Sequence, residues 1–286
     1  MKKLQFGIAE WCVPVAGPTI CRVAAEVGLD GVELNLGEFA HNLPLTDPHV
    51  RKLYLDEQQR YGVGFAALAV NTLDQSYVMP PENEQRAWER RFILKSAVET
   101  AAALKIPIVQ VPNFWDNAIK NHDELVLAAD FFREACELAE KHDVIVSSEN
   151  PMTVEENLEL MELVNRPNFR LYFDTENPVY FFGANTADML RAYGDRVCQI
   201  HVKDGTDAQM SCKQLGQGHA HFQECAQVIR EIGYEGWIVL ENNYDMPPFN
   251  TFENDRFELL AEDVRILRRT FARRPTPDGH RLTVNA

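Results

Sequence analysis

The strongest constraint on the fold of this chain is an eightfold alternation of short apolar segments with longer amphipathic ones. The short segments are rich in β-branched and other apolar residues, as strands buried on both faces are. The predicted strands cover residues 4–10, 31–36, 63–70, 106–111, 144–149, 169–174, 197–203 and 237–241. The predicted helices cover residues 18–28, 47–61, 83–104, 121–142, 153–165, 186–194, 222–232 and 252–272. Eight successive β–α units predict an α/β fold, the closed (β/α)8 TIM barrel, rather than an open sheet.

The length of the chain agrees with this fold, because 286 residues are normal for one such barrel. We expect a single catalytic domain over residues 1–272 and a C-terminal tail over residues 273–286, where the periodicity is lost. The loops after the second and third predicted strands, residues 37–46 and 71–82, are long. Loops that follow the strands lie on the catalytic face of a barrel, so both are candidate lids.

Charge and composition narrow the classes of partner. A formal net charge of −15 repels a phosphate backbone, which disfavours a general nucleic-acid binder. No apolar run reaches the ~18 residues of a membrane span, and the N-terminal segment reads as a strand rather than a secretory signal. The six cysteines form no C-x-x-C pair, so we expect reduced thiols in a cytoplasmic protein. We expect neither a nucleic-acid nor a membrane partner, and a homo-oligomer is left open.

Four of the predicted strands carry a metal-binding residue at or near their C-terminal end. Glu149, Asp174 and Glu241 end the fifth, sixth and eighth strands, and His201 lies near the end of the seventh. In a barrel these ends converge on one mouth, where three carboxylates and an imidazole are unfavourable without a cation. Any one of them alone would be explained as a polar rim residue. Together they predict one divalent ion, and three oxygens with one nitrogen suit Mn²⁺, Mg²⁺ or Co²⁺, with Zn²⁺ also compatible.

The segments around these residues resemble a known family. Ser-Glu-Asn at 148–150, Phe-Asp-Thr at 173–175, His-Val-Lys-Asp at 201–204 and Leu-Glu-Asn at 240–242 are similar to the xylose-isomerase-like barrel superfamily, and within it to the sugar-phosphate isomerase/epimerase group. The resemblance covers about residues 4 to 270. It implies a metal, most naturally Mn²⁺, bound by the four residues above, with Glu149 and Glu241 as catalytic carboxylates on opposite faces of a keto sugar. One would remove a proton beside the carbonyl, the metal would stabilise the enediolate, and the other would return the proton.

The resemblance leaves the reaction and the substrate open. It favours an isomerase or epimerase acting on a keto sugar, a sugar phosphate or a related hydroxy-carbonyl compound. A dehydratase of the inosose type shares the first proton abstraction and is the alternative, ahead of a non-catalytic sugar-binding barrel and an endonuclease IV-like nuclease. Ketose 3-epimerases of this group carry histidine and arginine at positions where this chain has Asn177 and Asp207. The nuclease uses additional histidines for its metals, and the strand-seven segment of this chain does not supply them.

Several further residues are expected to contact a carbohydrate substrate: Lys203, Asn177, Asn113, Trp11 and His41. Trp11 offers an apolar wall for a sugar ring, and the two asparagines can bind hydroxyl groups. Lys203 either polarises a substrate oxygen or forms an ion pair with Asp204 or Glu241. His41 lies on the first of the long loops, where it either reaches the substrate or faces solvent.

Three other features have an open role. Glu33 lies inside a predicted strand and needs a partner as a buried acid, for which Lys203 is one candidate. His219 and His221 would share a face in an extended segment, so they form either a second metal site or, as we favour, a hydrogen-bonding or surface pair. The turn at 216–218, Gly-Gln-Gly, is a weak candidate for binding phosphate, so phosphorylated and free substrates both stay open.

Overall fold

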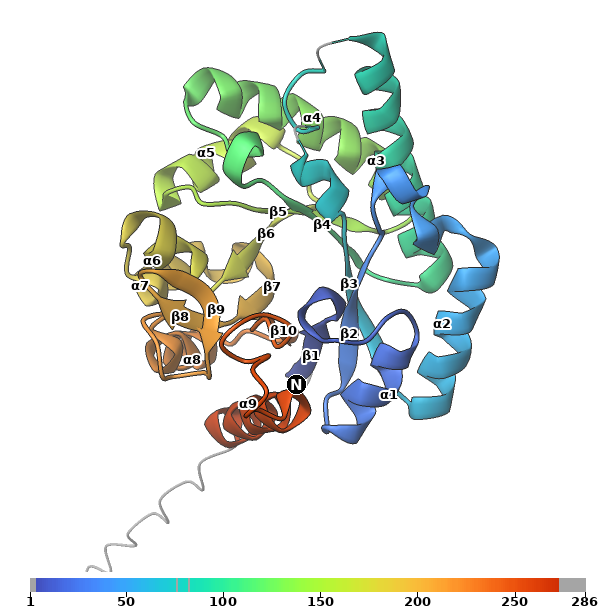
Figure 1. The fold of residues 1–286 in the computed structure, drawn as a ribbon. Coiled ribbons are helices and arrows are strands. Elements are labelled where there is room, and N and C mark those ends of the chain that lie inside the picture. The colour runs from blue at the N-terminus through green and yellow to red at the C-terminus, as the bar shows by residue number, and fades with distance from the viewer. Residues whose placement is uncertain (1–3, 76, 82, 273–286) are drawn as a thin grey trace, which may run out of the picture.

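The computed structural model describes residues 4–75, 77–81 and 83–272, and it confirms the predicted barrel. Eight parallel strands close in the order β1-β10-β7-β6-β5-β4-β3-β2 (Figure 1). The strands are β1 (Gln5–Ala9), β2 (Gly31–Asn35), β3 (Gly64–Ala69), β4 (Ile108–Pro112), β5 (Ile145–Glu149), β6 (Phe169–Asp174), β7 (Val197–Val202) and β10 (Trp237–Leu240). The tail predicted at 273–286 lies outside the described residues.

The helices lie around the strands as an outer ring (Figure 1). Those that match the predicted ones are α1 (Thr19–Glu26), α2 (Pro48–Tyr61), α3 (Glu84–Leu104), α4 (His122–Glu140), α5 (Val154–Val164), α7 (Thr186–Tyr193), α8 (Phe222–Glu231) and α9 (Arg256–Phe271). Side-chain caps fix several of their N-termini, as at Asn83, Asn121 and Thr153, each of which accepts a hydrogen bond from the third residue of its helix. Thr153 also forms a capping box with Glu156.

The sequence did not predict the additional elements on the loops. After β7 the chain forms an antiparallel hairpin, β8 (Asp204–Thr206) with β9 (Gln209–Lys213), and after β6 it forms the short helix α6 (Asn177–Phe182). Short 3-10 helices occupy Glu10–Cys12, Phe39–His41 (η2), Pro44–Thr46, Asn71–Asp74 (η4), Trp115–Asn117 and Gly194–Arg196. Elements this short carry too few residues to show a helical or alternating period, so a pattern search passes over them.

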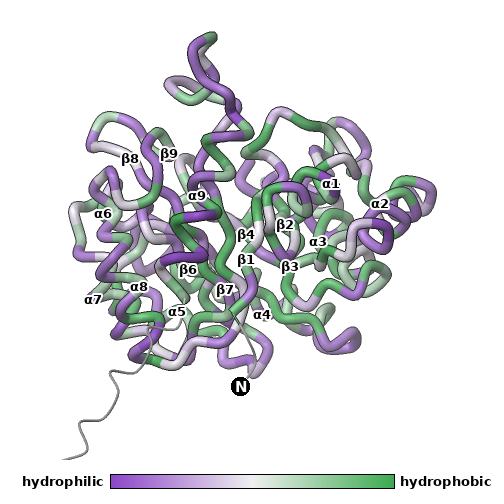
Figure 2. The backbone as a smooth tube through the Cα atoms, turned by 90° about the horizontal axis from the view of Figure 1, so that it is seen from below, coloured by the Kyte–Doolittle hydropathy of each residue, from purple (hydrophilic) through white to green (hydrophobic). Residues whose placement is uncertain are grey.

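The interior of the barrel and the layer between strands and helices form the core. Hydrophobic stretches gather in the centre, where the strands run, and hydrophilic stretches lie on the outer helices and loops (Figure 2). The Trp237 ring packs where a side chain on Gly31 would stand: a Cβ there would lie 2.5 Å from the ring and 2.4 Å from the Gly64 carbonyl oxygen. Only glycine fits this position, so the close approach of β2, β3 and β10 at their N-terminal ends depends on it.

Two composition-based expectations can be compared with the structure. All six cysteines have free thiols, as predicted. None of the helices described between residues 4 and 272 combines the length and the apolar character that a bilayer crossing requires.

Candidate metal centre and active site

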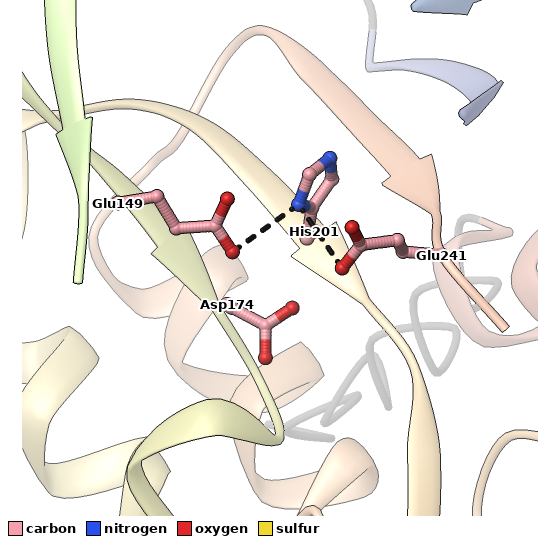
Figure 3. Close-up of side chains that lie close together, drawn as sticks. All are labelled: Glu149, Asp174, His201 and Glu241. Carbon is pink, nitrogen blue, oxygen red and sulfur yellow. Dashed lines mark hydrogen bonds and ion pairs between the residues drawn. The ribbon is translucent and has the colours of Figure 1, made fainter. Parts of the chain in front are cut away.

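The four residues predicted to share a metal come together at the C-terminal mouth of the barrel. Glu149, Asp174, His201 and Glu241 each offer one ligand atom, and these atoms all lie within 4.8 Å of one another. The carboxylates and the imidazole point toward a common space, with Glu149 and Glu241 on either side of His201 (Figure 3). The first three side chains are buried and Glu241 is partly buried. Positions separated by 25 to 40 residues along the chain thus form one cluster, because each closes a successive β–α unit.

Backbone pairing between the strands places these side chains. Asp174 of β6 is paired with His201 of β7, and His201 with Val239 of β10. Past the end of β10, the Glu241 amide still donates to the Val202 carbonyl at 3.0 Å. The ligand positions are therefore fixed by the sheet rather than by mobile loops.

His201 is held from two sides. Its Nδ1 lies 3.4 Å from Glu149 Oε1 and 3.4 Å from Glu241 Oε2, and its Nε2 lies 2.9 Å from Glu33 Oε2. Glu33 is fully buried on β2 and also accepts hydrogen bonds from Tyr172 and Gln199. The suggestion that Lys203 is the partner of Glu33 is therefore wrong: the acid instead orients the imidazole so that Nδ1 faces the carboxylates, an arrangement common behind metal-binding histidines.

Lys203 forms ion pairs within the cluster. Its Nζ lies 2.6 Å from Glu241 Oε2 and 3.2 Å from Asp174 Oδ2. The predicted ion pair of Lys203 with Glu241 is confirmed, and the alternative ion pair with Asp204 is wrong. The Asp204 carboxylate turns away to accept backbone N–H groups of the following loop.

Hydrogen bonds from neighbouring residues orient the three carboxylates that are predicted to bind the metal. Glu149 accepts from Gln110 Nε2 at 2.6 Å and from Asn177 Nδ2 at 2.9 Å. Asp174 Oδ1 accepts the backbone N–H of Asn177 at 2.6 Å, so α6 begins on this carboxylate. Trp11 Nε1 donates to Glu241 Oε1 at 3.2 Å. Each acid thus keeps one orientation, with a lone pair left for another ligand.

The pKa values of the three carboxylates in the cluster shift in different directions. Burial raises the pKa of Glu149 and of Asp174 above the usual range. Burial acts in the same direction on Glu241, but the charges of His201 and Lys203 outweigh it and lower the pKa of that carboxyl. Burial alone would lower the pKa values of His201 and Lys203, and the surrounding carboxylates raise both instead.

A divalent cation fits this donor set. With Glu33 included, four carboxylates face the two cationic side chains, which leaves two negative charges uncompensated. Asp174 Oδ2 is buried and accepts no hydrogen bond, although it lies 3.2 Å from the Lys203 ammonium. An excess of buried negative charge is costly unless an ion balances it. Three carboxylate oxygens and one imidazole nitrogen are ligands that a hard or borderline divalent ion prefers.

A cavity of about 300 Å³ opens above the cluster. Trp11, Asn177 and Lys203, three of the predicted substrate contacts, line it together with Glu149 and Glu241. The other two predicted contacts do not reach it. Asn113 is fully buried and accepts a hydrogen bond from Ser148, while His41 is exposed on η2. The prediction for Asn113 assumed that a polar residue following a strand turns toward the mouth, but Asn113 points back into the barrel wall. For His41, the structure shows the solvent-exposed one of the two alternatives.

Sequence reasoning missed Asp74, Gln110, Phe114 and Met210, which also line the cavity. The Phe181–Phe182 pair could be read from the sequence either as a packed loop anchor or as a cover for the substrate, and Phe181 lines the cavity from α6. Phe181 stacks on Phe114 at 5.8 Å and meets Trp115 edge-on at 5.2 Å, so the aromatic residues after β4 and β6 form one surface.

The two histidines after β9 have separate roles. His219 contacts Asp207 through Nδ1 at 2.8 Å and lies 3.4 Å from Glu176 through Nε2. His221 lies just before α8 with a left-handed backbone, so the two histidines are not the extended pair that the sequence suggested. Over the residues with described positions, the metal-competent cluster at the mouth is the one group of its kind. The hydrogen-bonding interpretation therefore holds for His219.

A closed parallel barrel with a polar cluster at its C-terminal mouth and a cavity above defines the class: this is an α/β barrel with its candidate site where barrel enzymes have their active sites. The family follows from comparison with known proteins. A family model described as xylose isomerase-like TIM barrel matches residues 21–270, and the chain belongs to that family.

The similar proteins include sugar epimerases. A 2-epi-5-epi-valiolone 7-phosphate 2-epimerase from an Actinoplanes species is 31% identical over 244 residues, which is 84% of this chain and 87% of that protein. The crystal structure of a D-allulose 3-epimerase from a Methylomonas species, in complex with D-allulose, has a TM-score of 0.74 at 17% identity and covers 95% of this chain and 98% of the other. The structure of the IOLI protein with a zinc atom has a TM-score of 0.73 at 17% identity, covering 94% and 100%.

Proposed function

We propose that this protein is a metal-dependent sugar isomerase or epimerase whose single divalent ion, Mn²⁺ in the first instance, is bound by Glu149, Asp174, His201 and Glu241. The observation that carries the proposal is the convergence of these four ligand atoms within 4.8 Å at the base of a cavity. The epimerase relatives support a carbohydrate substrate and this class of reaction. A zinc atom in a related fold supports a divalent ion without deciding which one.

When bound, such an ion supplies Lewis acidity, polarising a substrate carbonyl and stabilising the negative charge that develops on its oxygen. The chain's own residues hold and move the proton. Glu149 and Glu241 lie on either side of His201 (Figure 3), and both line the cavity, which supports one carboxylate acting from each side of a bound substrate. Their pKa values are pushed apart, upward at Glu149 and downward at Glu241. One of these two carboxylates would remove a proton from the substrate and the other would return one.

Four neighbours would orient these groups and the substrate. Asn177 and Gln110 hold the two oxygens of Glu149. Trp11 holds one oxygen of Glu241 and exposes its ring to the cavity, where an apolar face suits the C–H side of a sugar. Lys203 lies between Asp174 and Glu241 and can donate to a substrate oxygen at the cavity floor.

Solvent exchange tests the proposal. The Mn²⁺-loaded protein is incubated in D₂O with keto sugars, their phosphates and inososes, and label incorporation is followed by mass spectrometry and NMR. We expect label beside the carbonyl in a product of otherwise unchanged mass. Glu149→Gln and Glu241→Gln should each slow exchange by about 10²- to 10⁴-fold, whereas Glu155→Gln, an exposed control on α5, should not. Full exchange in both site variants would refute the two-carboxylate mechanism, and a product lighter by one water would indicate a dehydratase.

A further inference from the structure

The charge on the cavity wall bears on the substrate. Besides Glu149 and Glu241, the wall carries a third carboxylate, Asp74 of η4, and among its described lining residues Lys203 is the sole cation. That cation is already shared between Glu241 and Asp174, at 2.6 and 3.2 Å. Even with a divalent ion balancing Glu149 and Glu241, a phosphate ester would bring about two negative charges toward Asp74, and among the described lining residues no basic side chain is unshared.

The Gly-Gln-Gly turn at 216–218, which was a candidate for binding phosphate, is bound by the Asp204 carboxylate. Asp204 Oδ2 accepts the N–H groups of Gly216 at 2.7 Å and Gly218 at 3.1 Å, and its Oδ1 accepts that of Ala220 at 3.0 Å. A Cβ on Gly218 would lie 2.3 Å from this carboxylate, so the glycine is there to let the loop close on Asp204. The backbone donors that a phosphate needs are thus already used by a side chain of the protein.

The neighbouring hollow at the start of α8 is no better suited to an anion. It has a volume of about 430 Å³ and is lined by Asp207 and Glu224 as well as by the two histidines. His219 is paired with Asp207, so its ring is already shared with a carboxylate. Within the described part of this hollow, no lysine or arginine faces the space.

The rest of the wall is aromatic. Phe114, Trp115 and Phe181 form one continuous surface across the loops after β4 and β6. Trp115 is 61% exposed, which leaves its ring available to a ligand. Aromatic faces bind the C–H side of a neutral sugar or cyclic polyol and contribute nothing specific to a phosphate.

Resting on the proposed function, we infer that the substrate is an uncharged polyhydroxy ketone that lies against this aromatic surface, and not a phosphate ester. The relative from Actinoplanes is named for a 7-phosphate substrate. In this chain Asp74 and the closed Asp204 turn exclude that class of ligand.

Matched pairs of ligands test the inference. Binding of D-ribulose, D-fructose and D-tagatose to the Mn²⁺-loaded protein is compared by calorimetry with binding of D-ribulose 5-phosphate, D-fructose 6-phosphate and D-tagatose 6-phosphate, and D₂O exchange is measured on the same samples. We expect each free sugar to bind at least tenfold more tightly than its ester. An ester that binds as tightly as its sugar, or a failure of all six to bind, would overturn the inference. Tight binding of the free sugars without exchange would uphold it and refute the proposed reaction.

A variant isolates the role of the wall charge. In Asp74→Asn the side-chain oxygen can still accept the Phe114 N–H, which Asp74 Oδ1 accepts at 2.7 Å, so the loop keeps its anchor. We expect the preference for free sugar over ester to fall at least threefold in this variant. Asp56→Asn, an exposed control on α2, should leave the preference unchanged. An unchanged preference in Asp74→Asn, or an equal fall in both variants, would show that the wall charge does not exclude the ester.

Discussion

Replacing Glu33 by glutamine should weaken metal binding although Glu33 itself is not a ligand. The Glu33 carboxylate and the His201 ring are both fully buried and lie 2.9 Å apart, so their hydrogen bond is charge-assisted and screened from solvent. Glutamine keeps the shape and removes the charge, which leaves Nε2 of the imidazole with a weaker acceptor and Nδ1 less basic toward a metal. Loss of such a partner typically reduces metal affinity about 10- to 100-fold, or roughly 1.4 to 2.8 kcal/mol.

Isothermal calorimetry measures the Mn²⁺ affinity of Glu33→Gln. Two other variants show whether a loss of affinity comes from the contact between Glu33 and His201. Tyr172→Phe removes a hydrogen bond to Glu33 but keeps the acid, so its affinity should lie between those of the wild type and Glu33→Gln. Glu10→Gln changes a partly buried acid that contacts Tyr54 and the Asn35 backbone rather than one of the four proposed metal ligands. The Mn²⁺ affinity of this variant should stay within twofold of the wild type. Wild-type affinity in Glu33→Gln, or an equal loss in Glu10→Gln, would refute the reasoning.

Three further predictions concern pH and metal. The carboxylates raise the pKa of His201 despite its burial, so a metal must displace a proton, and Mn²⁺ affinity should rise by up to about tenfold per pH unit between pH 6 and 8; a flat profile would contradict this. Mn²⁺ at 100 times its Kd should raise the free energy of unfolding by about 2.7 kcal/mol, seen as a higher Tm that EDTA reverses. Burial raises the pKa of Glu10 to about 7 from 4.5, so ionising it costs the folded state as pH rises through this window. Between pH 4.5 and 7 the free energy of unfolding of the wild type should therefore fall by up to about 3 kcal/mol more than that of Glu10→Gln, as measured by urea titration. If the two proteins show the same dependence of stability on pH, the assignment is contradicted.

The sequence predicted the barrel and the four-residue cluster because both depend on a repeated pattern. Each strand is a short apolar run bounded by a helix, and in a closed parallel barrel the C-terminal ends of all strands lie at the same mouth. Glu149, Asp174 and Glu241 could therefore be grouped without knowing any distance. The predicted boundaries differ from the observed ones by only a few residues at most elements, where terminal turns fray or a cap residue precedes the helix.

Apart from the ion pair between Lys203 and Glu241, the partners of the cluster could not be predicted from the sequence. Glu33 was recognised as a buried acid, but which cation it meets depends on how far its side chain extends across the barrel interior, and His201 on the far wall is the group it reaches. Asn113 follows β4 just as Asn150 follows β5, yet only the local turn decides that Asn113 faces inward. The Gly-Gln-Gly turn suggested a phosphate site until the structure showed that Asp204 fills it.

The claim on which the account depends is that four distant side chains bind one ion. The direct measurement is metal content by inductively coupled plasma mass spectrometry after loading with Mn²⁺ and exhaustive dialysis, for the wild type, Asp174→Asn and His201→Ala. We predict one Mn²⁺ per chain in the wild type and a small fraction of that in both variants, with circular dichroism confirming that they stay folded. No bound metal in the wild type, or equal metal content in all three proteins, would contradict the account.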